Sequence, residues 1–125
     1  RLRQTYDLRT SSDDNSQRML NALLPGTVVP IHRHPNSTEN VFLLHGKLVE
    51  VLYEEERPGD GIEQMPDKAI GRRLHETARI VMDPSSGSYG CVVPAGTWHT
   101  VEVLEPSVIY ESKDGKYGKD GSESV

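Results

Sequence analysis

The chain lacks the features that several large classes of protein require. Its only cysteine, Cys91, can neither form a disulfide within the chain nor build a cysteine-based zinc site. No stretch approaches the ~20 apolar residues of a membrane helix, so we expect no membrane association. The 14 Lys and Arg residues are scattered and are outnumbered by 19 Asp and Glu, which argues against nucleic-acid binding. A disulfide scaffold, a membrane span and a collagen-like fibre are therefore excluded.

Further absences narrow the expected setting and chemistry. No apolar run follows Arg1, Leu2 and Arg3, and together with the lone cysteine this favours a cytoplasmic protein without a secretory signal. There is no glycine-rich phosphate-binding motif. The length of 125 residues, of which 34% are hydrophobic and 26% charged, predicts a single globular domain over residues 1–125.

Short apolar runs between turn residues predict an all-β fold. The chain contains 11 Gly and 8 Pro, and runs rich in β-branched residues lie between them. About seven to ten short strands of this kind fit a double-sheet jelly roll or a small barrel. The expected strands are 18–24 (whose period also suits a helix), 27–29, 31–34, 40–53 (bent or divided at Gly46), 78–82, 89–93, 99–104 and 107–112. Residues 1–15 are expected to form an arm, 54–77 a surface connection with one short strand, and 113–125 a loose tail.

Three histidines and one glutamate are spaced as metal ligands would be. His32 and His34 stand two residues apart, so on a strand both imidazoles project from one face, with Cβ atoms roughly 6–7 Å apart. Glu39 follows the next turn, and an antiparallel return would bring its carboxylate alongside the pair. The Pro94–Gly96 turn would aim His99 from a separate strand into the same space.

The alternative for His32, His34, Glu39 and His99 is that they are ordinary polar residues on a β surface, which is the usual case for a lone His-x-His pair. Three imidazoles and a carboxylate favour a divalent first-row transition metal, which could be Fe, Mn, Ni, Co, Cu or Zn, over Mg or Ca. On a six-coordinate ion, four protein ligands would leave about two positions for water, substrate or oxygen. On zinc they could instead close a tetrahedral, structural site. Ligating imidazoles must be neutral, so we expect the metal to be lost on acidification.

Two segments resemble the sequence motifs of the cupin superfamily. All fixed positions of the first cupin motif are matched, by Gly26, His32, His34, Glu39 and Gly46. The run Pro94-Ala95-Gly96-Thr97-Trp98-His99 resembles the second motif, although Ser88 replaces its leading glycine and Val103 its trailing asparagine. The resemblance implies a cupin-type double-stranded β-helix, a jelly-roll barrel. It also implies one interior metal ion, held by His32, His34, Glu39 and His99, and a homodimer.

A narrower resemblance is to the WbuC-type cupins, small metalloproteins of which some occur with O-antigen polysaccharide genes. It rests on residues 18–23, 30–35, 94–101 and 111–117, and it suggests a polar rim around the metal cavity, formed by Tyr6, Glu111, Lys113 and Tyr117. The alternative is that these four residues belong to solvated ends of the chain.

Two further candidates for substrate binding come from their position in the chain. Arg18 is an arginine in an apolar strand, and Trp98, beside His99, could line the pocket mouth or pack between the sheets. Arg18 and Asn21 are three residues apart, so on a regular strand they face opposite sides and cannot both enter one cavity.

Three functions are compatible with such a site, since the fold by itself does not choose between them. The first is a metal-dependent enzyme that acts on a small polar molecule, such as a sugar or sugar nucleotide, with an iron oxygenase as a variant. The second is a binding module that recognises a carbohydrate or another small ligand without turnover. In the third, the metal only ties the two sheets together.

Overall fold

The computed structural model describes residues 2–56, 73–118 and 121–125, and it is built almost entirely of strands. The strands are β1 (Arg3–Asp7), β2 (Ser16–Leu23), β3 (His32–Arg33), β4 (Glu39–Glu55), β5 (Leu74–Met82), β6 (Gly90–Val93), β7 (Trp98–Asp114) and β8 (Glu123–Ser124). One 3-10 turn, η1 (Pro84–Ser86), connects β5 to β6. None of the described segments forms a helix that could span a bilayer.

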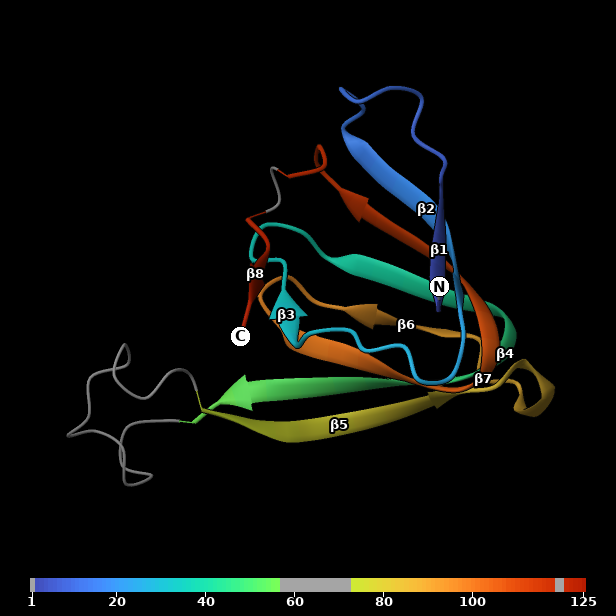
Figure 1. The fold of residues 1–125 in the computed structure, drawn as a ribbon. Coiled ribbons are helices and arrows are strands. Elements are labelled where there is room, and N and C mark those ends of the chain that lie inside the picture. Colours follow the sequence, from blue (N-terminus) through green and yellow to red (C-terminus); the bar gives the residue numbers. More distant parts are fainter. Residues whose placement is uncertain (1, 57–72, 119–120) are drawn as a thin grey trace.

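Two long strands, β4 and β7, form the frame of the fold (Figure 1). They pair antiparallel along most of their length, with Glu39 opposite Lys113 and Tyr53 opposite Trp98. β7 also pairs with β2 and β3, β4 pairs with β5 and β6, β1 pairs with β2, and β8 pairs with β3. Both long strands turn back at one side of the molecule, so their halves lie in two layers that enclose the interior.

The turn of β4 depends on Gly46. Its φ is +100°, in the region that favours glycine, and a Cβ atom there would lie 2.3 Å from the carbonyl oxygen of Pro106. The pairing register of β4 and β7 shifts between Leu43 and Leu48, as expected where a sheet folds over on itself through bulges.

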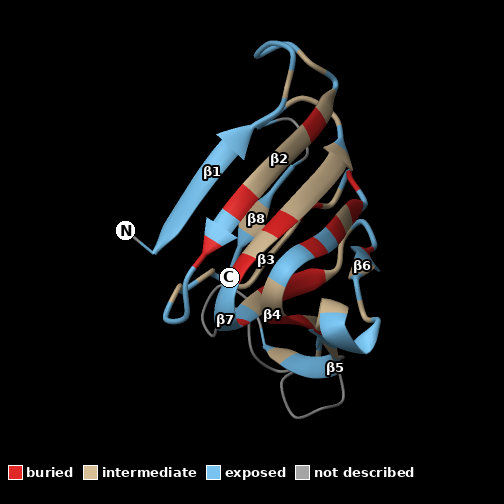
Figure 2. Cartoon of the chain, turned by 90° about the vertical axis from the view of Figure 1, so that its right-hand side faces the viewer, coloured by how far each residue is buried: buried red, intermediate tan, exposed pale blue. Residues whose placement is uncertain are grey.

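The apolar core lies on both sides of this turn. Its buried members are Leu23, Val41, Leu43, Leu48, Met82, Val103 and Ile109. Figure 2 shows the buried residues on β2, β4 and β7, whereas β1 is exposed along its whole length. Outside this cluster the interior also holds buried polar side chains, among them Asn21, Glu39 and His99.

The predicted all-β fold is confirmed, and the expected strand 18–24 is β2. The division at 105–106 is wrong, because β7 runs through Pro106. Proline lacks the amide proton of a regular ladder, but Pro106 lies where the register with β4 is shifted, between the pairs made by Glu105 and Val108.

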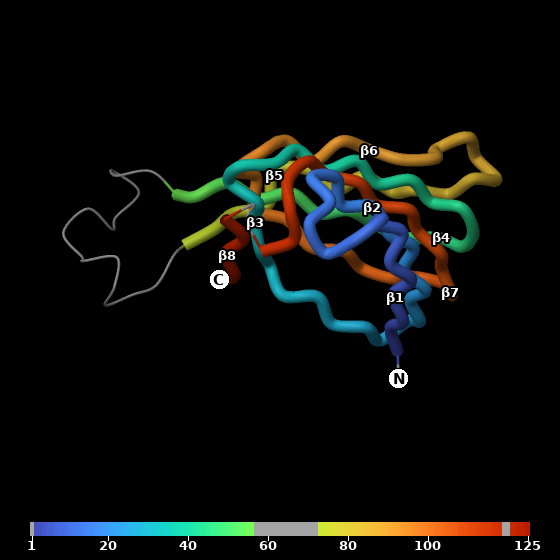
Figure 3. Tube along the Cα trace, turned by 90° about the horizontal axis from the view of Figure 1, so that it is seen from above, coloured from blue at the N-terminus to red at the C-terminus, as the bar shows by residue number. Residues whose placement is uncertain are grey.

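The expectations for the two ends of the chain also need correction. The arm contains β1, which pairs with β2 from Arg3 to Asp7. The tail contains β8, which lies beside β3 (Figure 3) and pairs with His32 and Arg33. Residues 27–29 do not form a strand, and most of the expected surface connection, 57–72, lies outside the described residues.

Candidate metal centre

Three histidines converge from β3, the turn after it, and β7. His32 and His99 are direct cross-strand partners, with ring centroids 4.2 Å apart. The His34 ring centroid lies 4.9 Å from that of His32 and 5.3 Å from that of His99. One ring nitrogen from each residue can be chosen so that all three lie within 4.8 Å of one another. The structure therefore brings these predicted ligands to one point.

Glu39 adds a carboxylate to this group from the first residue of β4. Its Oε1 lies 3.4 Å from His99 Nε2, and its Oε2 lies 3.9 Å from His34 Nε2. The side chain is buried, with 5% of the residue exposed. All four residues of the first and second motifs that were predicted to hold a metal thus face the same space.

Backbone carbonyls orient two of the imidazole rings. His32 Nδ1 donates a hydrogen bond to the carbonyl of Pro30, and His99 Nδ1 donates one to the carbonyl of Thr97, both at 2.8 Å. Each ring therefore keeps its Nε2 lone pair for another partner. His99 Nε2 is buried and makes no hydrogen bond within the described part of the chain. A buried acceptor without a donor, beside two imidazoles and a carboxylate, fits a divalent transition metal.

The third imidazole has two polar neighbours. Ser122 Oγ lies 2.7 Å from His34 Nδ1. Lys113 Nζ lies 3.4 Å from both ring nitrogens of His34 and 3.9 Å from Glu39 Oε2. The C-terminal segment and β7 therefore both contact the side chains of the candidate centre.

The electrostatic surroundings favour the protonation states that metal binding requires. Burial and the nearby Lys113 charge lower the pKa of His34 to about 4, and burial followed by the proximity of His99 lowers the pKa of His32. Burial opposes ionisation of Glu39, but His99, Lys113 and His34 outweigh it and lower its pKa. Neutral His32 and His34 and an ionised Glu39 are the forms that bind metal.

A cavity of about 700 Å³ adjoins these four side chains. Its walls come from β1, β2, β3, β4, β7 and the segment after β7. They carry both apolar residues, such as Leu23 and Ile109, and polar ones, such as Asn21 and Glu50. A cavity of this size holds a small organic molecule.

Two of the four candidates for substrate binding line the cavity, and two lie away from it. Glu111 and Tyr117 line the cavity. Arg18 does not, since its guanidinium lies 2.7 Å from Asp14 Oδ2, and its neighbours on β2, Gln17 and Met19, face the cavity instead.

Trp98 also lies away from the cavity. The residue is 2% exposed, and its Nε1 donates to Glu55 Oε1 at 3.2 Å. The Arg33 guanidinium lies 4.6 Å from the ring centroid, the arrangement of a cation–π contact. Because successive residues of a strand face opposite sides, placing His99 in the interior turns Trp98 away from it.

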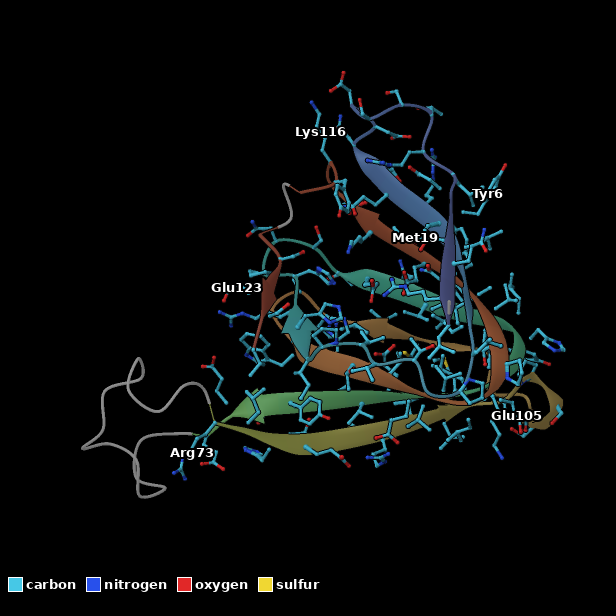
Figure 4. All side chains as sticks on the ribbon, in the orientation of Figure 1. Tyr6, Met19, Arg73, Glu105, Lys116 and Glu123 are labelled. Atoms are coloured by element: carbon cyan, nitrogen blue, oxygen red, sulfur yellow. The ribbon has the colours of Figure 1, made fainter. Side chains whose placement is uncertain are left out.

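Of the other two residues predicted for the polar rim, one lines the cavity and one does not. Lys113 lines the cavity, whereas Tyr6 is 66% exposed and points away from the body of the protein (Figure 4).

Among the cavity residues that were not identified from the sequence, Glu50 and Ser122 matter most for the site. Glu50 is almost fully buried and lines the cavity. A charged residue within the apolar run Leu48-Val49-Glu50-Val51-Leu52 was the signal that could have revealed it. Ser122 had no such signal, because its contact with His34 depends on the tail returning to β3.

Several solved structures share this architecture. An oxalate oxidase in complex with the substrate analogue glycolate is 16% identical, with a TM-score of 0.64, over 99% of this chain and 55% of that one. The oxalate decarboxylase of Lactobacillus farciminis, in a formate complex, is 12% identical with a TM-score of 0.61, over 99% and 31%. CapF with a tropolone inhibitor is 13% identical with a TM-score of 0.61, over 97% and 31%.

The chain thus spans about half the length of the oxalate oxidase it matches, 55%, and less of the other two. At these identities the likeness shows the fold, which is the cupin-type jelly-roll barrel. The narrower resemblance to the WbuC-type cupins remains a prediction.

The sequence itself was compared with family models and with curated proteins. The search of curated proteins found no match. Residues 1–63 match the family model described as a domain of unknown function (DUF6016). That segment includes three of the four candidate ligands, His32, His34 and Glu39, together with Glu50. The chain therefore belongs to the DUF6016 family and has the fold of a cupin.

Proposed function

We propose that this chain is a metal-dependent enzyme that acts on a small polar molecule, a sugar or sugar nucleotide. The observation that carries the proposal is the convergence of His32, His34, His99 and Glu39 beside a cavity of about 700 Å³ whose walls carry polar as well as apolar side chains. A metal needed only to tie sheets together would not require such a cavity.

The four side chains would hold the ion, and each has a defined part. His32 and His99 present Nε2 because their Nδ1 protons are held by backbone carbonyls. Glu39 supplies the negative charge that partly offsets that of a dication. A divalent ion bound there acts as a Lewis acid towards a hydroxyl or carbonyl oxygen. Glu111, in the wall of the same cavity, is a group that could exchange a proton with a bound molecule.

The substrate class is the finer part of the proposal. Support comes from the resemblance to the WbuC-type cupins, some of which occur with polysaccharide genes, and from the polar side chains in the cavity wall, such as Asn21, Glu50 and Glu111. The oxalate oxidase and oxalate decarboxylase named above share the fold, but they are too distant for their substrates to be transferred.

A binding module with a bound metal and no turnover is the second candidate. Lys113 favours this candidate, because its ammonium group lies 3.4 Å from both His34 ring nitrogens and 3.9 Å from Glu39 Oε2. In this position it restricts how closely a substrate could approach a metal ion held by these residues.

Incubation of the metal-loaded protein with a panel of sugars and sugar nucleotides, followed by NMR in D₂O, tests the proposal. We expect deuterium incorporation or a new product with at least one compound, and none with a His99→Ala variant. Binding without any chemical change would favour the module. If the metal-loaded protein neither changes nor binds any member of the panel, the proposal is wrong.

A further inference from the structure

Glu50 is a buried acid that the metal centre does not use. It lies on β4 opposite Val101 of β7. The next pair on the same face of the sheet, two residues along each strand, is Leu52 and His99. Only 1% of the residue is exposed, and the side chain lines the cavity. Within the described residues its Oε2 makes no hydrogen bond. A buried acid oxygen without a partner is costly, so a ligand that bonds to it would remove that cost.

Glu111 lies in the same cavity and is held by a short chain of hydrogen bonds. Asn21 Nδ2 donates to Glu111 Oε2 at 2.9 Å, and Thr5 Oγ1 donates to Asn21 Oδ1. All three residues line the cavity. The chain fixes the orientation of the Asn21 amide, and with it one oxygen of Glu111, which leaves the remaining acid oxygen able to accept from a ligand.

Two of the three Lys and Arg residues that line the cavity, Arg9 and Lys113, have acidic partners, and the third, Arg3, lies near Glu111. Arg9 Nη2 lies 2.7 Å from Asp7 Oδ2 at the cavity wall. Lys113 lies beside Glu39, as described above. A ligand carboxylate placed between Glu50, Glu111 and Glu39 would be repelled by whichever of these acids is ionised, and it has no proton to donate to their acceptor oxygens.

The protonation of the two acids points to the same kind of ligand. Burial, reinforced by the charge of Glu39, raises the pKa of Glu50 to about 9 and that of Glu111 to about 7. At neutral pH the wall therefore offers both donors and acceptors. A hydroxyl group can hydrogen-bond to both the donors and the acceptors of this wall, because it donates one proton and accepts through its lone pairs.

We propose that Glu50 and the Thr5–Asn21–Glu111 chain form a hydroxyl-binding wall in the metal cavity. This wall selects a neutral polyol or sugar and disfavours a dicarboxylate. The inference deepens the proposed function and rests on it, since the wall and the metal centre share one cavity.

Saturation-transfer NMR on the zinc-loaded protein tests this selectivity, because zinc is diamagnetic. The probes are myo-inositol, sorbitol, glucose and xylose on one side, and malonate and succinate on the other. The variants are Glu50→Leu, which removes the acid, and Glu50→Gln, which keeps a donor and an acceptor. Glu105→Leu is the matched control, since Glu105 is an exposed acid at the turn of β7 (Figure 4). Zinc content is measured on every sample.

We expect one or more polyols to bind and the dicarboxylates not to bind. Polyol affinity should fall at least about tenfold in Glu50→Leu, and should be kept in Glu50→Gln and in Glu105→Leu. Preferential binding of malonate or succinate would overturn the proposal, and so would undiminished polyol binding by Glu50→Leu, or no binding of either class. A protein that takes up no zinc but still binds polyols through Glu50 would refute the metal hypothesis and leave the wall intact.

Discussion

Glu50 places an acid on the inner face of β4, at a position between Leu48 and Leu52 where the strand otherwise presents leucine. Burial raises the pKa of its carboxyl group to about 9, from an ordinary value of 4.5. The folded protein therefore holds a proton that the unfolded chain releases. Between pH 4.5 and about 9 folding takes up this proton, so the contribution of Glu50 to the free energy of unfolding falls as the pH rises.

A Glu50→Gln variant isolates this effect. The amide is neutral at every pH, so the variant should lack the contribution of Glu50 to the pH dependence of the free energy of unfolding. That contribution is at most about 1.4 kcal/mol per pH unit. The variant should be more stable than the wild type at pH 8 and close to it at pH 4.5. Urea unfolding across this range measures both curves, with Glu105→Gln as a control at an exposed site. Parallel curves for Glu50→Gln and the wild type would contradict the account.

Ser122 allows a second prediction at the scale of a single side chain. Its Oγ lies 2.7 Å from His34 Nδ1, and groups that orient a ligating imidazole typically change metal affinity about 10–100-fold. Ser122→Ala should weaken zinc binding by that factor, as measured by competition with a chelator. Ser124→Ala is the matched control, because Ser124 is exposed in the neighbouring strand β8. Equal zinc affinities for Ser122→Ala and the wild type would show that His34 does not need this contact.

The candidate ligands could be predicted from the sequence because their order along the chain encodes the geometry. His32 lies in a short strand and His34 directly follows it, and the turn before His99 fixes the direction from which His99 approaches them. Arg18 could not be placed in this way, because a strand sequence shows which residues alternate but not which side faces inwards. For the same reason the sequence left open whether Trp98 lines the pocket mouth or packs between the sheets. Because His99 points inwards, the preceding residue Trp98 points the other way.

At the scale of the element, the folding over of β4 depends on one glycine. Gly46 has φ +100°, and an added Cβ would lie 2.3 Å from Pro106 O and 2.8 Å from Ser107 Cα, both backbone atoms of β7. A Gly46→Ala substitution therefore combines backbone strain with a clash that cannot relax cheaply.

Gly87 provides the matched comparison for this substitution. Its φ is +84°, but no atom lies within 4 Å of an added Cβ. Gly87→Ala should cost roughly 1 kcal/mol of unfolding free energy, from strain alone, and Gly46→Ala should cost roughly 2–4 kcal/mol. Chemical denaturation compares them. Similar losses for the two variants would mean that the close approach of β4 and β7 is not essential.

The strands themselves could be predicted from the alternation of apolar residues, but their limits could not. The sequence at Glu105-Pro106 indicates a break, whereas the ladder tolerates Pro106 because the register of β7 against β4 is already shifted there. The polar composition of Arg3–Asp7 and of the tail indicates loose ends, although both pair through backbone groups. Pairing of this kind is independent of side-chain hydrophobicity.

At the scale of the whole molecule, the candidate metal centre joins the two layers. Glu39 comes from the first half of β4, whereas His32 and His99 come from β3 and the first half of β7. Figure 1 shows these elements in different layers, on the side away from the turn of β4 and β7. The apolar core lies near that turn, so an ion would hold the end of the barrel that the core does not.

Metal binding should consequently stabilise the folded protein. An ion present at 100 times its Kd adds about 2.7 kcal/mol to the free energy of unfolding. Thermal unfolding with zinc and with a chelator should show the higher midpoint in zinc. The difference should shrink on acidification, because protonated imidazoles do not bind metal. Identical midpoints in the two conditions at neutral pH would mean that the centre does not hold zinc in the folded state.

The most direct test of the metal centre is the metal content of protein purified without chelator and without added metal, measured beside a His32→Ala/His99→Ala double variant. The account predicts about one equivalent of iron, manganese, nickel, cobalt, copper or zinc per chain in the native protein, and its loss in the double variant. A native protein that contains no metal and takes up none on titration would contradict it, and a cupin-shaped binding domain would remain.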